Sequence, residues 1–247
     1  MERKNNTVTI ILMVLIFFVL FIIIIGITMR ECRREGYSDD KRIKAYCINR
    51  LERPDRLRKF QNLVRENNNY RNLDIEIVPA VEKKNLLPFF NVKFPMGALG
   101  CSLSHLRCLL SFLALKNEEH CVIFEDDAVC SNKVGDIIHI INEYSKKYDI
   151  LILGYNYIHD NDKKLVCEKN ERLNISICED FEKIYGSHSY IVNKKAANYL
   201  VSKLLPIKIP YDIFFSNDEI KKNLSVALVK DNICKAADLS DSNTITS

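Results

Sequence analysis

The chain has 247 residues, of which 47% are apolar and 28% are charged, and it contains only 7 glycines and 6 prolines. These proportions indicate a folded protein of one or two domains, and they exclude collagen-like, low-complexity and wholly disordered chains. The formal net charge of +4 is small for this length, which argues against a protein that binds the phosphate backbone of a nucleic acid.

An uncharged apolar segment lies near the start of the chain. Residues 7–29, TVTIILMVLIFFVLFIIIIGITM, are long enough to cross a hydrocarbon core of about 30 Å as a helix. A cleaved signal peptide is the alternative, but its apolar region is about 7 to 15 residues long and ends at a small-x-small site, which this segment lacks. We therefore expect a short tail over residues 1–6, a transmembrane anchor over 7–29, a polar stem over 30–42 and a folded domain over 43–247.

The sequence leaves open the side of the membrane on which the folded domain lies. Basic residues are more frequent after the apolar segment than before it, which places the domain in the cytosol by the positive-inside rule. Sequons for N-glycosylation at Asn5, Asn174 and Asn223 favour the lumen instead, although about two are expected by chance. The nine cysteines show no zinc-binding spacing, and an odd number cannot all pair within the chain.

The folded domain alternates short apolar runs with stretches of helical period. We expect buried strands at 43–48, 73–78, 121–127, 149–153, 189–192 and 225–229, and helices at 55–67, 102–115, 134–144 and through Leu200, Val201 and Leu204. Strands that alternate with amphipathic helices are typical of an α/β domain with a mostly parallel central sheet.

Three consecutive acids, Glu125, Asp126 and Asp127, end one of the predicted strands. Ligands of open α/β sheets bind at the carboxyl ends of the strands. Side chains alternate along an extended segment, so we expect Glu125 and Asp127 to point to one side, where they could share a divalent cation, and Asp126 to point to the other. Such a cation could bridge the two phosphates of a nucleotide. The alternative is a solvated acidic turn, because short motifs often match by chance.

Charged residues also follow the first predicted strand. Arg53 and Arg56 flank Pro54 and Asp55 at the expected start of a helix, where backbone N–H groups and guanidinium groups favour anions. The alternative is that Asp55 only caps the helix and that both arginines are solvated.

Glycine and histidine residues mark two further candidate sites. Gly97 and Gly100 precede the second expected helix and would allow its N-terminus to approach a ligand. Ser104 and His105 lie too far inside that helix to cap it, so they either contact a sugar or phosphate or are buried hydrogen-bonding partners. His188, in the segment GSHSY, has the same two interpretations.

Six blocks in order resemble glycosyltransferase family 25, which includes bacterial lipooligosaccharide galactosyltransferases and the collagen galactosyltransferases. The blocks are AYCINRLERPDR, GALGCSLSH, VIFEDDA, YDILILG, GSHSYIVNKKAA and PIKIPYD, and the resemblance spans residues 43–215. It implies a GT-A-like nucleotide-sugar-binding fold, a UDP-sugar donor, commonly UDP-galactose, a divalent metal, Mn2+ or Mg2+, and transfer with inversion at the anomeric carbon.

The resemblance also assigns expected roles to residues of this chain. Glu125, Asp126 and Asp127 match the family's acidic motif, with Glu125 and Asp127 as metal ligands. The positions that match the donor-binding blocks are Arg53, Asp55, Arg56, Gly100, Ser104, His105, Asp126 and His188. Asp212 matches an acid of the C-terminal block and is the candidate general base. Asp149 is the alternative base, but it begins its predicted strand, at the wrong end for a site.

We therefore predict a membrane-anchored glycosyltransferase that transfers a hexose from a UDP-sugar to a hydroxyl of a protein or glycan acceptor, with galactose as the first candidate for the hexose. By analogy it is a type II, single-pass protein of the Golgi or endoplasmic reticulum, or of a viral or host membrane. Arg50 stands where the family more often has Leu, and the segment after Asp238 is short. We therefore expect acceptor recognition to differ from the family more than donor binding does. The alternatives are a catalytically inactive relative that binds glycans or cell-surface partners, and a metal-dependent phosphoryl-transfer enzyme or hydrolase, for which HxxE and HExxH spacings are absent.

Overall fold

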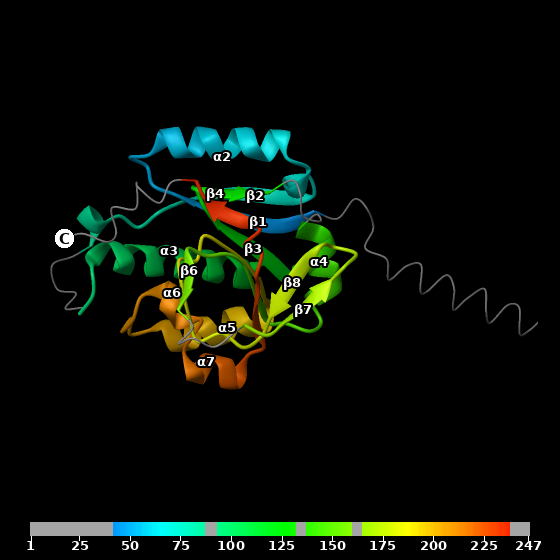
Figure 1. Cartoon of the computed structure of the whole chain (residues 1–247). Coiled ribbons are helices and arrows are strands. Elements are labelled where there is room, and N and C mark those ends of the chain that lie inside the picture. Colours follow the sequence, from blue (N-terminus) through cyan, green and yellow to red (C-terminus); the bar gives the residue numbers. More distant parts are fainter. Residues whose placement is uncertain (1–41, 87–92, 132–136, 160–164, 238–247) are drawn as a thin grey trace, which may run out of the picture. The chain divides into compact units, whose positions relative to one another are not determined.

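The computed structural model describes residues 42–86, 93–131, 137–159 and 165–237 (Figure 1). The predicted tail and transmembrane anchor, and all but the last residue of the predicted stem, lie outside these residues. Within them, one helix, Met96–Ala114, is long and apolar enough to cross a membrane, and half of its most apolar window is buried inside the protein. The apolar composition of this helix is explained by its packing in the core of the domain.

A mixed eight-stranded sheet in the order β2-β1-β3-β10-β5-β11-β8-β7 forms the centre of the domain. In that order the strands are Leu73–Pro79, Ile43–Asn49, His120–Glu125, Ser189–Asn193, Ile150–Gly154, Val226–Val229, Ile175–Cys178 and Cys167–Asn170. Strands β10 and β8 run antiparallel to both of their neighbours, and the other strands of this sheet share one direction. The predicted α/β domain with a mostly parallel sheet is confirmed, with these two reversed strands as the difference.

Helices cover both faces of the sheet (Figure 1). On one side lie α2 (Pro54–Glu66) and α4 (Ile137–Tyr144), and on the other lie α3 (Met96–Ala114), α5 (Lys194–Leu204), α6 (Tyr211–Phe214) and α7 (Asp218–Asn223). Short 3-10 helices occupy Asn68–Tyr70 (η1) and Lys83–Asn85 (η2). Consecutive residues of β3 pack on opposite faces of the sheet: Ile123 belongs to one hydrophobic core and Phe124 to the other. Each such buried side chain contributes about 1.5–3 kcal/mol to folding.

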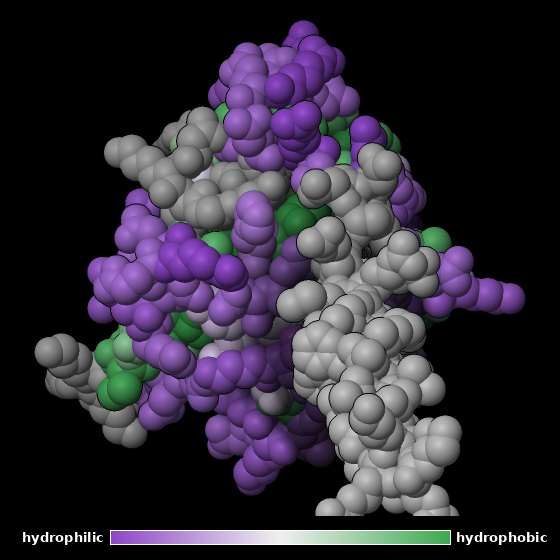
Figure 2. Space-filling view, turned by 90° about the vertical axis from the view of Figure 1, so that its right-hand side faces the viewer, coloured by the Kyte–Doolittle hydropathy of each residue, from purple (hydrophilic) through white to green (hydrophobic). Residues whose placement is uncertain are grey.

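Two short ribbons extend the domain beyond the main sheet. Strand β4 (Ala128–Cys130) pairs with β12 (Cys234–Ala236), and β6 (Tyr157–His159) pairs with β9 (Lys183–Tyr185). A disulfide between Cys130 and Cys234 joins the first ribbon, and a second disulfide joins Cys167 of β7 to Cys178 of β8. On the face seen in Figure 2, hydrophilic side chains dominate the described surface and apolar ones form small separate patches, as is normal for a folded protein surface.

Two element boundaries near the candidate site differ from the predicted ones. Helix α3 begins at Met96 after Pro95, so Gly97 and Gly100 lie within its first turns rather than before it. A Cβ at Gly100 would lie 2.3 Å from the carbonyl oxygen of Val81, so this glycine permits close packing of the helix on protein backbone rather than on a ligand. Strand β3 ends at Glu125, and the last two acids of the motif form the turn that follows.

Candidate active site

The candidate site lies at the carboxyl end of β3, where three segments meet. Glu125 is the last residue of this strand, and the loop after β1 lies on one side of it. Because β10 is antiparallel to β3, with Ser189 opposite Phe124, the segment that precedes β10 lies on the other side. The backbone N–H of Glu125 donates to the carbonyl oxygen of His188 at 2.8 Å. Reversal of β10 therefore brings the GSHSY block to the acids.

Asp126 is buried and holds the loop after β1. Its Oδ2 accepts hydrogen bonds from Asn49 Nδ2 at 2.6 Å and from the backbone N–H of Arg50 at 3.3 Å, and its Oδ1 lies 3.4 Å from Nη1 of Arg56. Burial raises the pKa of Asp126, and these donors oppose that shift. With its oxygens engaged by protein donors, Asp126 positions Arg56 and the loop.

Asp127 combines an ion pair with an unpartnered oxygen. Its Oδ2 lies 3.2 Å from Nη1 of Arg56, whereas its Oδ1 is buried and has no hydrogen-bond partner within the described residues. Burial, and after it the charge of Glu125, raises the pKa of Asp127 to about 7 against the opposing charge of Arg56. The sequence analysis predicted that Asp126 and Asp127 point to opposite sides. This prediction is wrong, because the turn brings both carboxylates to the guanidinium of Arg56.

Glu125 faces helix α3. Its Oε1 lies 3.4 Å from Nε2 of His105 and accepts a hydrogen bond from Ser187 Oγ at 3.5 Å. Burial raises its pKa, but the hydrogen bond and charge of His105, followed by the charges of His188 and Arg56, lower the pKa of Glu125 overall. The pKa of Glu125 is thus lowered and that of Asp127 is raised, and a bound cation would favour the ionised form of both carboxylates.

His105 is fully buried, and both of its ring nitrogens lie close to polar groups of the protein. Its Nδ1 lies 3.0 Å from the hydroxyl of Tyr190, which lies 2.9 Å from the hydroxyl of Tyr211. The rings of His105 and Tyr211 stack with centroids 4.3 Å apart and planes 7° apart. His105 is therefore a buried hydrogen-bonding partner, as one of the two predictions states, and its Nε2 also reaches the acidic motif.

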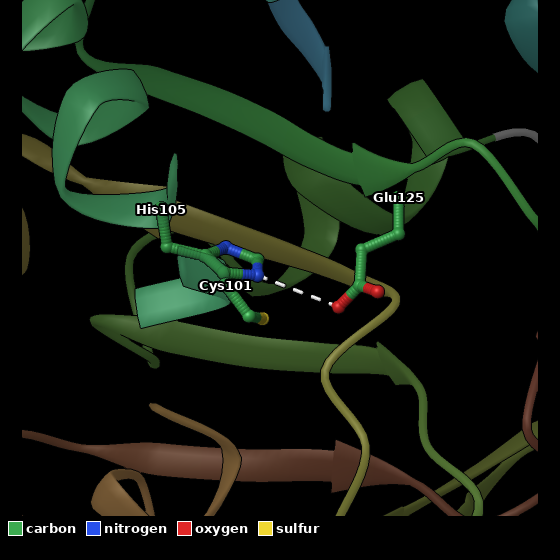
Figure 3. Close-up of side chains that lie close together, drawn as sticks. All are labelled: Cys101, His105 and Glu125. Atoms are coloured by element: carbon green, nitrogen blue, oxygen red, sulfur yellow. Dashed lines mark hydrogen bonds and ion pairs between the residues drawn. The ribbon is translucent and has the colours of Figure 1, made fainter. Parts of the chain in front are cut away.

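Cys101 is a site residue that the sequence analysis missed. It lies one helical turn before His105, and the ligand atoms of Cys101, His105 and Glu125 are all within 4.8 Å of one another (Figure 3). The available signal was the spacing of four residues between a cysteine and a histidine, which places both on one face of a helix.

His188 is buried between two glycines. A Cβ at Gly154 would lie 3.0 Å from its Cδ2, and a Cβ at Gly186 would lie 2.9 Å from its Cε1. Gly186 also has a φ of +85°, which glycine adopts without strain. Burial lowers the pKa of His188, against the charges of Glu125 and Asp212. Its Nε2 is buried and has no hydrogen-bond partner among the described residues.

Asp212, the predicted base, reaches the same region from α6. Its Oδ2 accepts a hydrogen bond from the backbone N–H of Gly186, and its Oδ1 accepts one from Ile213, both at 2.9 Å. Burial, followed by the charges of Glu125, Asp212 and Asp127, raises the pKa of the Cys101 thiol. Asp212 and Glu125 also contact the same segment, residues 186–188, although they are far apart in sequence.

Other predicted donor-binding residues have protein partners. Ser104 is fully buried; its Oγ accepts a hydrogen bond from the backbone N–H of Val81 at 2.8 Å and donates to the carbonyl oxygen of Gly100 at 2.7 Å. This geometry favours the interpretation of Ser104 as a buried hydrogen-bonding partner, and it makes Gly100 a packing position.

Arg53 and Asp55 form a bidentate ion pair at the start of α2. Nε and Nη2 of Arg53 donate to the two carboxylate oxygens of Asp55 at 3.0 and 2.9 Å, and this hydrogen bonding lowers the pKa of Asp55. The helix N-cap is Arg53, not Asp55. Basic and acidic side chains line a small pocket beside the acidic turn, together with apolar groups: Arg53, Arg56, Lys59, Phe60, Asp126 and Asp127.

Asp149, the alternative base, lies away from these groups. It precedes β5, at the opposite end of the strands from Glu125, and accepts hydrogen bonds from Lys195 Nζ at 2.7 Å, Asn193 Nδ2 at 2.9 Å and the backbone N–H of Ser225 at 3.0 Å. These contacts give Asp149 a structural role in joining the starts of two strands to α5.

Comparison with known families identifies the class of this protein. The sequence profile described as glycosyltransferase family 25 (LPS biosynthesis protein) matches residues 42–215, a range that includes the acidic turn. The chain belongs to glycosyltransferase family 25. The resemblance that the six sequence blocks indicate is thereby confirmed.

Individual relatives are distant. A glycosyltransferase 25 family member from Drosophila pseudoobscura pseudoobscura is 23% identical over 189 residues, which are 68% of this chain and 29% of the relative. The chain thus matches less than a third of the length of this curated relative. Among solved structures, A197 from STIV has a TM-score of 0.44 at 14% identity, with 76% of this chain and 81% of that chain covered. The inositol-1-phosphate CTP transferase from T. maritima has a TM-score of 0.41 at 13% identity, with 76% and 85% covered.

Proposed function

We propose that this protein transfers a hexose, with galactose as the first candidate, from a UDP-sugar to a hydroxyl of a protein or glycan acceptor. The reaction would need Mn2+ or Mg2+ and would invert the anomeric carbon. The observation that carries this proposal lies at the end of β3, where Glu125 and Asp212 both contact the segment 186–188 and where Asp127 has a buried oxygen without a partner among the described residues. Membership of the glycosyltransferase family makes a nucleotide-sugar donor and an acceptor the expected substrates of such a site.

The residues present fit a hard divalent cation. Asp127 offers a buried oxygen without a protein partner, and the neighbouring charge of Glu125 raises the pKa of Asp127. Carboxylate oxygens are the ligands that Mn2+ and Mg2+ prefer. When bound, such an ion supplies positive charge that stabilises a departing diphosphate.

The basic side chains beside the acidic turn would bind the donor phosphates. Arg53, Arg56 and Lys59 line the small pocket there, and guanidinium groups bind phosphate oxygens in a bidentate manner. Asp126 contributes indirectly, because its hydrogen bonds from Asn49 and Arg50 fix the loop that precedes these cations.

Asp212 would accept the proton of the acceptor hydroxyl. Its two oxygens are fixed by the backbone N–H groups of Gly186 and Ile213, so the carboxylate is oriented before the substrate arrives. An ionised carboxylate within hydrogen-bonding reach of the nucleophile supplies the general base that an inverting displacement requires. His188, whose pKa burial lowers, would offer to the substrate its buried Nε2, which has no hydrogen-bond partner among the described residues.

The proposed location is the oxidising side of a membrane, with the segment over residues 7–29 as the anchor. Two disulfides, Cys130–Cys234 and Cys167–Cys178, support it, because disulfides persist in the secretory lumen and outside the cell but are rare in the cytosol. On this basis we favour the lumenal orientation that the sequons indicate over the cytosolic one that the flanking charges indicate.

A donor screen on the full-length chain in detergent tests the proposed function. We expect UDP-galactose, with Mn2+, to raise the melting temperature, because a ligand present at about 100 times its dissociation constant stabilises the fold by about 2.7 kcal/mol. UDP release should follow when a galactoside or a hydroxyl-bearing peptide is added, and EDTA should abolish both effects. Stabilisation and turnover that are indifferent to chelation would contradict the metal-dependent mechanism, and a chain that no nucleotide sugar stabilises would contradict the whole proposal.

A further inference from the structure

Cys101, His105 and Glu125 form a cluster whose chemistry differs from that of the acidic pair. Helix α3 presents the thiol and the imidazole from one face, and the end of β3 presents the carboxylate opposite them (Figure 3). We propose that these three side chains bind a thiophilic divalent cation, with Zn2+ as the first candidate. This site shares Glu125 with the proposed Mn2+ site but is otherwise separate from it.

The donor set and its spacing fit zinc. Zn2+ binds thiolate, imidazole and carboxylate ligands in a tetrahedral arrangement, and three protein ligands leave one position for water. The usual bond lengths place tetrahedral ligand atoms about 3.3–3.7 Å apart. Nε2 of His105 already lies 3.4 Å from Oε1 of Glu125, and the Cys101 sulfur lies within 4.8 Å of both. Metal binding would require the Cys101 side chain to move so that its sulfur comes within this spacing.

The surroundings of His105 orient it as a metal ligand. When Nδ1 donates to the hydroxyl of Tyr190 at 3.0 Å, the lone pair of Nε2 points toward Cys101 and Glu125. Tyr190 can then donate to the hydroxyl of Tyr211 at 2.9 Å, and the stacked ring of Tyr211 restrains the imidazole plane. A second hydrogen bond of this kind fixes the tautomer of metal-bound histidines in proteins. Without a cation, the other tautomer places a proton between His105 and Glu125.

The charge around the thiol also favours a cation. After burial, the charges that act on Cys101 are those of Glu125, Asp212 and Asp127, all of them negative. Binding would convert the thiol to a thiolate and release its proton to solvent, so that the sulfur–metal bond replaces the S–H bond. Cys101 is half-buried, whereas the other free cysteines of the described residues, Cys47, Cys108 and Cys121, are buried. Among these cysteines, Cys101 is the one whose sulfur lies within 4.8 Å of a histidine nitrogen and a carboxylate oxygen in a three-residue cluster.

Cobalt spectroscopy on the full-length chain tests the site directly, in detergent and in a buffer free of thiols so that the disulfides stay intact. Co2+ bound to a thiolate has an intense charge-transfer band in the near ultraviolet. We expect this band to saturate at one ion per chain and to disappear when Zn2+ is added. Cys101→Ser should abolish the band, and the matched control Cys108→Ser, on the same helix, should retain it.

A cobalt spectrum without the thiolate band, or a band that persists in Cys101→Ser, would overturn the proposal. Because His105 is fully buried and its replacement could unfold the domain, the decisive variant is Cys101→Ser, with its melting temperature measured to verify folding. Asp127→Asn should retain the band, which separates this site from the proposed Mn2+ site. The spectrum needs neither donor nor turnover, so a failure here is distinguishable from a failure of the proposed transferase activity.

Discussion

Nη1 of Arg56 lies 3.2 Å from Oδ2 of Asp127 and leaves Oδ1 of the same carboxylate buried without a partner in the part of the chain that the structure describes. The guanidinium thus neutralises one side of the carboxylate while the other side remains available to a cation. This arrangement is the basis of two predictions, one for each residue.

Asp127→Asn should abolish the stabilisation of the fold by UDP-sugar and Mn2+ together. The amide keeps the size of the side chain but offers no negative charge to a cation, and it removes the repulsion from Glu125 that raises the pKa of Asp127. Calorimetry or thermal unfolding with and without Mn2+ measures the loss. Asp180→Asn, at an exposed position, is the matched control. Donor affinity equal to that of the wild type would remove Asp127 from the metal site.

Arg56→Ala should lower the free energy of unfolding by about 2–3 kcal/mol at neutral pH. Loss of one partner from a buried ion pair costs about 3–5 kcal/mol, and we reduce this value because the side chains of Arg56 and Asp127 retain 14% and 16% exposure. Mn2+ should restore part of the loss, since it can replace the missing positive charge. Urea titrations of wild type, Arg56→Ala and Arg56→Lys give the comparison. An equal effect of Mn2+ on all three proteins would argue against a cation beside Arg56.

Asp212→Asn should reduce the turnover number by about 10² or more while the affinity for UDP-sugar stays unchanged. The amide has a single acceptor oxygen, so it can keep only one of the two hydrogen bonds that the carboxylate accepts from the backbone N–H groups of Gly186 and Ile213, and the melting temperature of the variant verifies that it folds. Transfer assays at saturating donor, together with donor-binding measurements, separate the two quantities. If the variant is as active as the wild type, Asp212 is not the base.

The chain order of the main elements could be predicted from sequence because each has a clear apolar pattern. The runs at Ile43–Asn49 and Ile150–Gly154, for example, are strands of nearly the predicted length. The direction of β10 could not be predicted, because hydrophobic periodicity is the same for parallel and antiparallel strands. The short strands β6, β9 and β12 lack a buried run long enough to give a signal.

The position of Glu125 near the end of a strand was predictable from the apolar run before it, whereas its role as a metal ligand together with Asp127 stays a prediction. The motif could not reveal that β3 ends at Glu125, so the turn that brings Asp126 and Asp127 to Arg56 was missed. The contacts of Ser104 could not be predicted either. Its place in the motif left a ligand contact open, but its hydroxyl is hydrogen-bonded to the backbone of Val81 and Gly100. Such contacts depend on tertiary packing, which local patterns do not encode.

The carboxylate of Asp149 should make stability depend on pH. Burial raises its pKa, but hydrogen bonds from Lys195, Asn193 and Ser225, and the charge of Lys195, lower the pKa of Asp149 overall from its ordinary value of 3.8. A carboxyl whose pKa is lower in the folded state stabilises the fold above its unfolded pKa, and this contribution is lost as pH falls through the folded pKa. Asp149→Asn should therefore cost about 1–2 kcal/mol at pH 7, and the difference from wild type should shrink below about pH 4.

Chemical denaturation of both proteins at a series of pH values measures this difference, and subtraction removes the titration of the other acids. The exposed Asp180→Asn variant is again the control. A difference between wild type and Asp149→Asn that stays constant down to pH 2 would show that the charge of Asp149 does not stabilise the fold.

The proposed lumenal orientation rests on the two disulfides and on the two exposed sequons. If the domain lies in the lumen, reduction should expose four thiols that resist alkylation in the denatured, unreduced protein, those of Cys130, Cys234, Cys167 and Cys178. Asn174 and Asn223 are exposed, so the expressed protein should also lose mass on treatment with a glycosidase, and the double substitution of both asparagines by Gln should remove that change. Alkylation of all nine cysteines without reductant, in a protein whose mass the glycosidase leaves unchanged, would place the domain in the cytosol, as the basic residues after the apolar segment suggest.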